Sequence, residues 1–513
     1  MVGDEPRTHF SFWTPAIPPL EHRLPRNGFF VSGYRLLRTA WLLLTLPAHL
    51  ALLFASLVAP SPLHRHWICT VADFHPLWNS RQRLVYPLLR RTIWAIADVG
   101  SADALTPNAR FKFPWWAWAL EEFTVRIGRG ARVQLQATEV ELPRLARTLG
   151  WVQNDGMLDP SGQVGFGPVP CFWFERADLG GPSSTKDSID RRASKGERIV
   201  LYFVGGGYVT GSPTEGSRCF KLAREAGLRV VGANFRKATS PDQAFPAQLQ
   251  DALAVYAHLV LELGFHDIVL AGDSAGSNLA LMLVQYLARL EVPRSGRFGS
   301  NAGFSERGLL LMPTGLLLFS PWCDLTAATY GEAILKRKGM RDDPKHDIIC
   351  ASMATNSIRL FLARLLGEGC AGSQGAKSPQ HSEADGVATL RSAHPWFSPC
   401  LATAESSWNR VSEVYARRSG NRSAGERSAS VRWRRQQQPL RVLVTTGTTE
   451  LFNLEIVRLC EILNRAGSRA QGGGIAVQVV SAEGEVHAFP LVPEWVSPEA
   501  SEAWRKIQRW LRE

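Results

Sequence analysis

The stretch DIVLAGDSAGSNLALMLVQYLARL, residues 267–290, decides the fold that the sequence predicts. Its first five residues are a short apolar run typical of a buried strand, and from Asn278 onward apolar residues recur at helical spacing. Between them, GDSAG matches G-x-S-x-G, whose glycines let a strand turn sharply into a helix while the serine holds a strained backbone. We predict that Ser274 presents its hydroxyl as a nucleophile. The alternative, a buried serine in a tight turn, does not account for the flanking strand and helix.

Strands and helices are expected to alternate on either side of this stretch. Strands are predicted over residues 122–127, 133–141, 169–175, 199–204, 229–235, 267–271, 316–319, 440–445 and 476–481. Helices are predicted over residues 215–226, 247–263, 278–290 and 498–511, the last with Ser497 as its N-cap. Short apolar strands separated by helices favour an α/β fold, with a mostly parallel sheet covered by helices on both faces.

Three regions are predicted along the chain. Residues 1–60 form an N-terminal segment, residues 61–120 a helical linker or cap region, and residues 121–513 the main domain. Within that domain, residues 329–395 mix helical spacing with turns, as a cap over a site would. Residues 181–197 and 410–438 are predicted to be polar insertions; nine arginines lie between Arg410 and Arg441 inclusive, which favours a solvated loop.

Residues 40–59 carry no formal charge and are long enough, at about 1.5 Å per residue, to cross roughly 30 Å of hydrocarbon. We predict an uncleaved membrane anchor, with a kinked or interfacial helix left open by Pro47 and His49, and a buried helix of the main domain as a third reading. Basic residues before the run outnumber those after it, which predicts a cytosolic N-terminus and a lumenal main domain. The residues before the run are Arg23, Arg26, Arg35 and Arg38, against Arg65 after it.

Composition narrows the possible partners. The net charge is +12, yet zinc-finger spacings, RNA-recognition signatures and basic heptads are missing from the sequence, so no nucleic-acid partner is predicted. The eight cysteines are scattered, without a C-x-x-C pair or matching histidine spacing, so neither a metal site nor a cofactor is predicted.

A serine nucleophile requires a base and an acid later in the chain. His487, in EGEVHAFP just beyond the last predicted strand, is the expected general base. Glu450 follows the strand LRVLVTTG and is the expected carboxylate that orients the imidazole, because the order serine, acid, histidine is typical of this motif. Asp324 and Glu455 are the rival acids.

Acyl transfer also needs hydrogen-bond donors aimed at the developing oxyanion. The run Gly205-Gly206-Gly207 follows the strand IVLYFV, and Ala275 follows the nucleophile. We predict an oxyanion hole formed by the backbone amides of Gly205, Gly206 and Ala275.

Together these residues resemble the hormone-sensitive-lipase-like group of α/β-hydrolases, which includes arylacetamide deacetylases and fungal steryl acetate hydrolases. The resemblance covers about residues 198–513: YFVGGGYVTGS resembles the group's glycine motif, GDSAGSNLA its elbow, TGTTELFNLE its acid segment and EVHAF its base segment. It implies an α/β-hydrolase fold with a helical cap. It also implies an endoplasmic-reticulum membrane protein with one N-terminal span, in which Asn421 could be glycosylated. Val204 departs from the group, whose glycine motif begins with histidine.

The expected activity is hydrolysis of carboxylic esters through an acyl-enzyme, with short acyl groups on a hydrophobic alcohol as the expected substrates. Two alternatives stay open. One is an amidase or deacetylase of the same fold. The other is a non-catalytic protein that binds a hydrophobic ligand, as the gibberellin receptors of this fold do.

Overall fold

The computed structural model of the chain is built around one sheet. The residues that it describes are 44–59, 74–99, 133–148, 151–152, 164–177, 189–214, 218–238, 243–291, 311–326, 328–338, 340, 342–363, 365, 394–420, 438–470 and 474–513. The predicted strand over residues 122–127, the predicted glycosylation site Asn421 and residues 181–188 of the predicted insertion at 181–197 lie outside the described residues.

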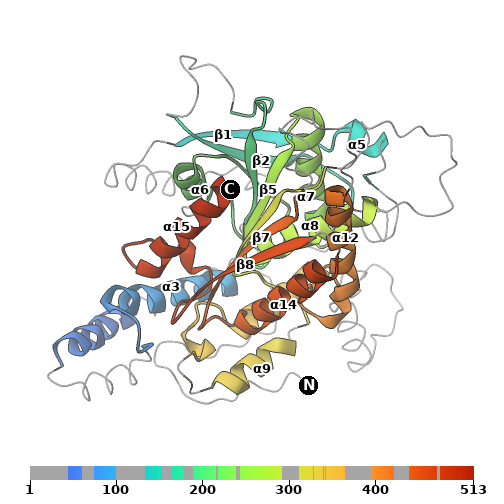
Figure 1. Cartoon of the computed structure of the whole chain (residues 1–513). Coiled ribbons are helices and arrows are strands. Elements are labelled where there is room, and N and C mark those ends of the chain that lie inside the picture. The colour runs from blue at the N-terminus through green and yellow to red at the C-terminus, as the bar shows by residue number, and fades with distance from the viewer. Residues whose placement is uncertain are drawn as a thin grey trace, which may run out of the picture.

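Eight strands form this sheet in the order β1-β2-β4-β3-β5-β6-β7-β8 (Figure 1). Strand β2 runs antiparallel to both of its neighbours, and the strands from β4 to β8 are parallel. The strand bounds are β1 Val133–Val140, β2 Val169–Arg176, β3 Arg198–Phe203, β4 Arg229–Ala233, β5 Asp267–Asp273, β6 Gly315–Phe319, β7 Leu440–Gly447 and β8 Ile475–Ala482. The mostly parallel sheet predicted from the sequence is confirmed.

Helices cover both faces of the sheet, as predicted (Figure 1). One face carries α6, Arg218–Ala226, and α15, Pro498–Arg512, whose N-cap is Ser497. The other face carries α7, α8, α12 and α14. Their bounds are Ala247–Ala257, Ala275–Glu291, Glu405–Gly420 and Asn453–Arg469, and a π-helical turn, η4, continues α7 over His258–Glu262.

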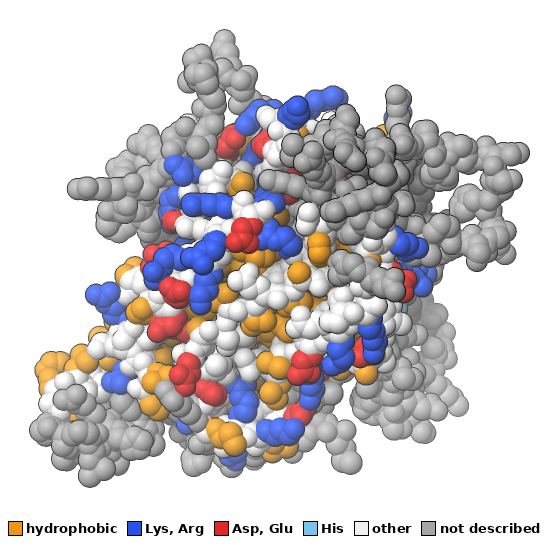
Figure 2. Space-filling view, in the orientation of Figure 1, with side chains coloured by type: hydrophobic (Ala, Val, Ile, Leu, Met, Phe, Trp, Pro, Cys, Tyr) orange, Lys and Arg blue, Asp and Glu red, His pale blue; other side chains and the backbone are white. Residues whose placement is uncertain are grey.

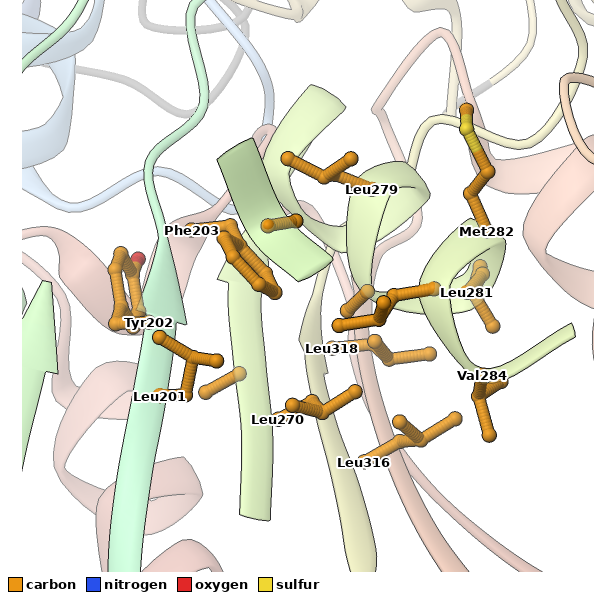
Figure 3. Packing of buried hydrophobic residues seen from close by; sticks show 14 of the residues in the cluster. Leu201, Tyr202, Phe203, Leu270, Leu279, Leu281, Met282, Val284, Leu316 and Leu318 are labelled. Carbon is orange, nitrogen blue, oxygen red and sulfur yellow. The ribbon is translucent and has the colours of Figure 1, made fainter. Parts of the chain in front are cut away.

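The core lies between the central strands and α8. Leu201, Leu270 and Leu316 come from three adjacent strands, and Leu281 and Val284 of α8 pack against this layer (Figure 3). All five side chains are fully buried. Burial of such residues stabilises the fold by about 1.5–3 kcal/mol each, so the strand–turn–helix unit around Ser274 is fixed by its packing.

The N-terminal region docks against the loop that follows β8. Helix α3, Ser80–Val99, places Tyr86 in a small apolar cluster with Val486, Val492 and neighbouring side chains. A further helix covers residues 44–58 of the predicted span at 40–59, and residues 40–43 lie outside the described part. Within the described residues, none of the helices combines the length and apolarity that crossing a membrane requires.

The predicted cap contains two described helices. Helix α9 spans Ala328–Arg337, a short turn η6 spans Pro344–His346, and α10 spans Ala351–Leu362. The ring of Phe361 in α10 stacks on Tyr208, with ring centroids 3.9 Å apart, so α10 covers the loop after β3. Residues 366–393 of the predicted cap lie outside the described part of the chain.

The prediction of a polar loop from residue 410 is wrong for its first part. Residues 410–420 belong to α12, which packs against α8 and α14. Trp408, Val411, Val414 and Tyr415 are buried at helical spacing, while Arg410 and Arg417 lie on other faces of the helix. The number of arginines concealed this periodicity, because long basic side chains are tolerated on the solvated face of a helix.

Two tryptophans near the C-terminus allow a matched stability test. Trp504 of α15 is buried between Phe319 and Lys221, whereas Trp495 is 58% exposed. We expect Trp504→Ala to lower the free energy of unfolding by about 3–5 kcal/mol, because it leaves a cavity beneath α15. Trp495→Ala should change it by less than about 0.5 kcal/mol. Urea unfolding followed by circular dichroism measures both, and equal effects would contradict this account of the packing.

Candidate active site

Ser274 lies in the sharp turn between β5 and α8. Its φ is 54°, in the left-handed region, and its backbone N–H donates to the carbonyl oxygen of Phe319 at 2.9 Å. Both flanking positions require glycine, because the backbone segments approach too closely for a side chain. A Cβ on Gly272 would lie 2.5 Å from the backbone of Gly276, and a Cβ on Gly276 would overlap the carbonyl of Phe203. The strained turn predicted from GDSAG is therefore present.

Glu450 and His487 meet beside this edge of the sheet, as the sequence predicted. Nδ1 of His487 lies 3.0 Å from Oε2 of Glu450, and both side chains are buried. The imidazole also packs edge-on against Phe452, with ring centroids 5.1 Å apart. A carboxylate on Nδ1 fixes the tautomer and leaves Nε2 to exchange a proton.

The second oxygen of Glu450 is held by three donors. Oε1 accepts from the backbone N–H of Gly447 at 2.5 Å, from the Thr446 hydroxyl at 2.6 Å and from the Ser320 hydroxyl at 3.1 Å. These bonds anchor the carboxylate independently of the histidine.

The rival acids are used elsewhere. Asp324 accepts from the backbone N–H and the hydroxyl of Thr326, two residues further on. Glu455 accepts the backbone N–H of Cys323 at 2.5 Å. Each of these carboxylates holds a backbone N–H group, and the acid that contacts Nδ1 of His487 is Glu450.

Ser320, which follows β6 directly, joins the three loops. Its hydroxyl donates to Glu450 and accepts the backbone N–H of Ala488 at 2.8 Å, while the carbonyl just before it bonds to Ser274. Sequence reasoning missed this residue. Its position at the carboxyl end of a strand between β5 and β7 was the available signal, because functional side chains gather there in open α/β sheets.

The predicted oxyanion donors need one correction. The backbone N–H of Gly205 donates to the buried carboxylate of Asp273 at 2.9 Å, so it does not point toward a substrate. Among the described residues, the N–H groups of Gly206 and Gly207 meet no acceptor. Ala275 is the first residue of α8, where backbone N–H groups lack partners within the helix. Gly205 is therefore excluded as an oxyanion donor. The candidate donors are the backbone N–H groups of Gly206, Gly207 and Ala275.

The glycine loop is braced without the histidine that Val204 replaces. Asp273 accepts from Gly205 and from the Tyr202 hydroxyl at 2.6 Å, and it forms an ion pair with Arg218 at 3.3 Å. On the far side of the loop, the Tyr208 hydroxyl donates to Asn278 of α8 at 2.6 Å. The bond to Gly205 holds the loop at a fixed position relative to the turn of Ser274.

The histidine loop is also held from outside by α3. The Glu485 carboxylate accepts from the Tyr86 hydroxyl at 2.5 Å, from Gln82 at 2.7 Å and from the Ser497 hydroxyl at 2.9 Å. Burial raises the pKa of Glu485 to about 7. Its carbonyl oxygen accepts the Thr449 hydroxyl at 2.6 Å, which ties the histidine loop to the acid loop.

Opposing effects set the basicity of His487. Burial alone lowers the pKa of the imidazole, but the hydrogen bond and charge of Glu450, together with the charges of Asp347 and Asp273, raise it above its usual value. A neighbouring carboxylate therefore makes this imidazole a better proton acceptor than an isolated buried histidine.

Comparison with known proteins agrees with this fold. Residues 200–359 match a family model described as alpha/beta hydrolase fold. The strand order and this match together identify the α/β-hydrolase fold. The matched segment includes the glycine loop and Ser274 and ends before Glu450.

Several relatives are hydrolases by name. The chain is 29% identical over 200 residues to an acetyl-hydrolase of Streptomyces hygroscopicus, across 37% of this chain and 59% of the relative. It is 36% identical over 104 residues to an ethyl acetate hydrolase of Pseudomonas putida, across 18% of this chain and 32% of the relative. The chain thus spans less than two thirds of either relative's length. A solved esterase of the bacterial hormone-sensitive lipase family aligns with 83% of this chain and 97% of its own at 19% identity, with a TM-score of 0.43.

The Glu450 contact can be tested without an activity assay. In Glu450→Gln we expect the pKa of His487 to fall, because the neutral amide removes the negative charge that favours the imidazolium. NMR titration of the histidine ring measures this change. Asp324→Asn is the control and should leave the ring titration unchanged, and an unaltered pKa in Glu450→Gln would contradict the assignment.

Proposed function

We propose that the protein is a serine hydrolase that cleaves carboxylic esters. Ser274 attacks the ester carbonyl, His487 takes the hydroxyl proton and passes it to the leaving alcohol, and water then releases the acyl group from the enzyme. Glu450 orients the imidazole and stabilises its protonated form. The observation that carries the proposal is the bond between His487 and Glu450, which Ser320 links to the strained turn of Ser274 at the same edge of the sheet.

The backbone donors complete the proposed mechanism. The N–H groups of Gly206, Gly207 and Ala275 would bind the oxyanion of the tetrahedral intermediate. One such donor commonly contributes about 3 kcal/mol to transition-state stabilisation. Val204 stands where the glycine motif of the resembled group has a histidine. The bond from Gly205 to Asp273 nevertheless holds the glycine loop in place, which supports a catalytic protein over one that only binds a ligand.

Short acyl esters of a hydrophobic alcohol are the proposed substrates. The names acetyl-hydrolase and ethyl acetate hydrolase of two relatives support an acetyl-type acyl group. Stacking of Phe361 on Tyr208 places apolar side chains of the cap over the glycine loop, which supports a hydrophobic alcohol. The narrower resemblance to steryl acetate hydrolases remains a prediction, for which a sterol acetate is the direct probe.

A chain-length series tests the activity. We expect the purified protein to hydrolyse p-nitrophenyl acetate and butyrate faster than octanoate, and Ser274→Ala to lower kcat by at least about 10⁴-fold, because the nucleophile is lost. Ser468→Ala, at an exposed helix position, is the matched control and should keep full activity.

The matched anilides in the same assay separate esterase from amidase. Faster turnover of p-nitroacetanilide than of p-nitrophenyl acetate would favour the amidase. A protein that binds these compounds without any turnover dependent on Ser274 would be a ligand-binding protein.

We further propose that residues 44–58 attach the protein to a membrane surface. The outward side chains of this helix are apolar, with Leu44 77%, Phe54 66% and Val58 58% exposed. Its polar residues face inward instead: His49 contacts the carbonyl of Arg83 at 3.1 Å, and the Ser56 hydroxyl donates to Leu53. Hydrophobic side chains gather over this helix at the lower left of Figure 2. A location in the endoplasmic reticulum remains a prediction.

Vesicle flotation tests the attachment. Exchanging Phe54 and Leu57 for Gln should weaken binding to phosphatidylcholine vesicles by at least about tenfold, because each large apolar side chain contributes about 1.5–3 kcal/mol when buried in lipid. Leu335→Gln is the control, since Leu335 is 72% exposed on α9 of the cap and should not affect flotation. Unchanged flotation of the double variant would exclude this face as the attachment surface.

A further inference from the structure

The cap contributes a buried carboxylate to the loops of Glu450 and His487. Asp347 lies between η6 and α10, and its side chain is fully buried. Its Oδ1 accepts the backbone N–H of His487 at 2.8 Å, and its Oδ2 accepts the backbone N–H of Leu451 at 2.8 Å. One side chain therefore joins the histidine to the residue that follows the acid.

These bonds fix a part of the site that the Glu450 contact leaves free. Glu450 orients the imidazole ring, whereas Asp347 holds the backbone from which the ring projects. The next residue, Ala488, has a φ of 55° and donates its N–H to Ser320. The backbone is thus held at His487 and directly after it, and bonds to an ionised carboxylate are about twice as strong as neutral ones.

A second cap residue holds the acid loop. Arg337, the last residue of α9, donates to the carbonyl oxygen of Glu450 at 3.0 Å and to that of Thr448. The cap therefore reaches both loops through side chains of opposite charge. This arrangement places structural support for the catalytic edge in the insertion itself as well as in the sheet.

The Asp347 carboxylate also changes the charge around the imidazole. Burial raises the pKa of Asp347 to about 6; the positive charge of His487 and the backbone N–H groups of Leu451 and His487 oppose this effect, and Glu450 adds to it. Conversely, Asp347 is one of the negative charges that raise the pKa of His487. The other charged groups that face the pair are Glu450 from the loop after β7, Asp273 from β5 and Arg337 from α9.

We propose that Asp347 is a positioning residue of the hydrolytic site. It holds the His487 backbone and the Glu450 loop in one geometry and places a negative charge beside the imidazole. The inference rests on the proposed function for its kinetic readout, and its electrostatic part can be measured without turnover.

Asp347→Asn is the direct test, because asparagine keeps the shape but loses the charge and turns an N–H₂ group toward a backbone N–H that Asp347 accepts. With p-nitrophenyl butyrate we expect kcat to fall about 10- to 100-fold, since small displacements of a catalytic group cost that much, while KM stays nearly constant. The acid limb of the kcat/KM profile should move to lower pH, because the imidazole loses a neighbouring negative charge. The control is Asp343→Asn, which neutralises the buried carboxylate that caps η6 and should keep both kcat and the acid limb.

Two outcomes would overturn the proposal. A folded Asp347→Asn variant with the wild-type acid limb would leave Asp347 a purely structural residue, whatever the loss of kcat. The same holds if the ring pKa of His487, followed by NMR, does not fall in this variant. If the wild-type protein shows no turnover that depends on Ser274, the proposed function is contradicted. The ring titration then still tests whether Asp347 acts on His487.

If Asp347→Asn does not fold, the wild-type protein supplies the test. Selective labelling with ¹⁵N-histidine, with the His487→Gln variant to assign the resonance, reports on the amide that donates to Asp347. We expect this resonance to shift with a midpoint near pH 6 as the carboxylate titrates. A resonance that is constant through that range would overturn the role of Asp347.

Discussion

The close approach of α8 to β3 is the constraint on which the catalytic edge depends. Gly276 lies against the carbonyl of Phe203, where any side chain would overlap it. This contact brings the N-terminus of α8 and the turn of Ser274 to the end of β3, where the glycine loop begins. Holding a serine in the left-handed region costs of order 1–3 kcal/mol, and the buried layer of β3, β5 and α8 beneath the turn offsets that strain.

The parallel order of the strands then determines which side chains can meet. Phe319 ends β6 and bonds to the Ser274 backbone, and the loops after β7 and β8 supply Glu450 and His487. Since the carboxyl ends of neighbouring parallel strands lie at one edge, the topology of the sheet places residues more than two hundred positions apart at the same edge. The cap and α3 hold these loops from two sides, so the histidine segment is restrained well beyond its bond to the acid.

Sequence reasoning succeeded where function follows from chain order and local periodicity. The short apolar strand and the helix around GDSAG predicted the turn of Ser274, and the order of motifs predicted the pairing of Glu450 with His487. It failed where the answer depends on the direction of a single group. A run of three glycines does not reveal that the first amide points at Asp273. Nor does Asp347, in a polar stretch without periodicity, carry a local signal that it reaches two distant loops.

The contact between α3 and Glu485 bears on where the folding unit of this protein begins. Hydropathy and strand prediction both suggest cutting the chain near residue 121, just before the sheet. A truncation there would remove Tyr86 and Gln82, which donate to the Glu485 carboxylate two residues before His487. It would also expose the apolar cluster around Val486 to water. The minimal folding unit must therefore include a segment that belongs to none of its strands, and shortened versions would be expected to lose order first at the histidine.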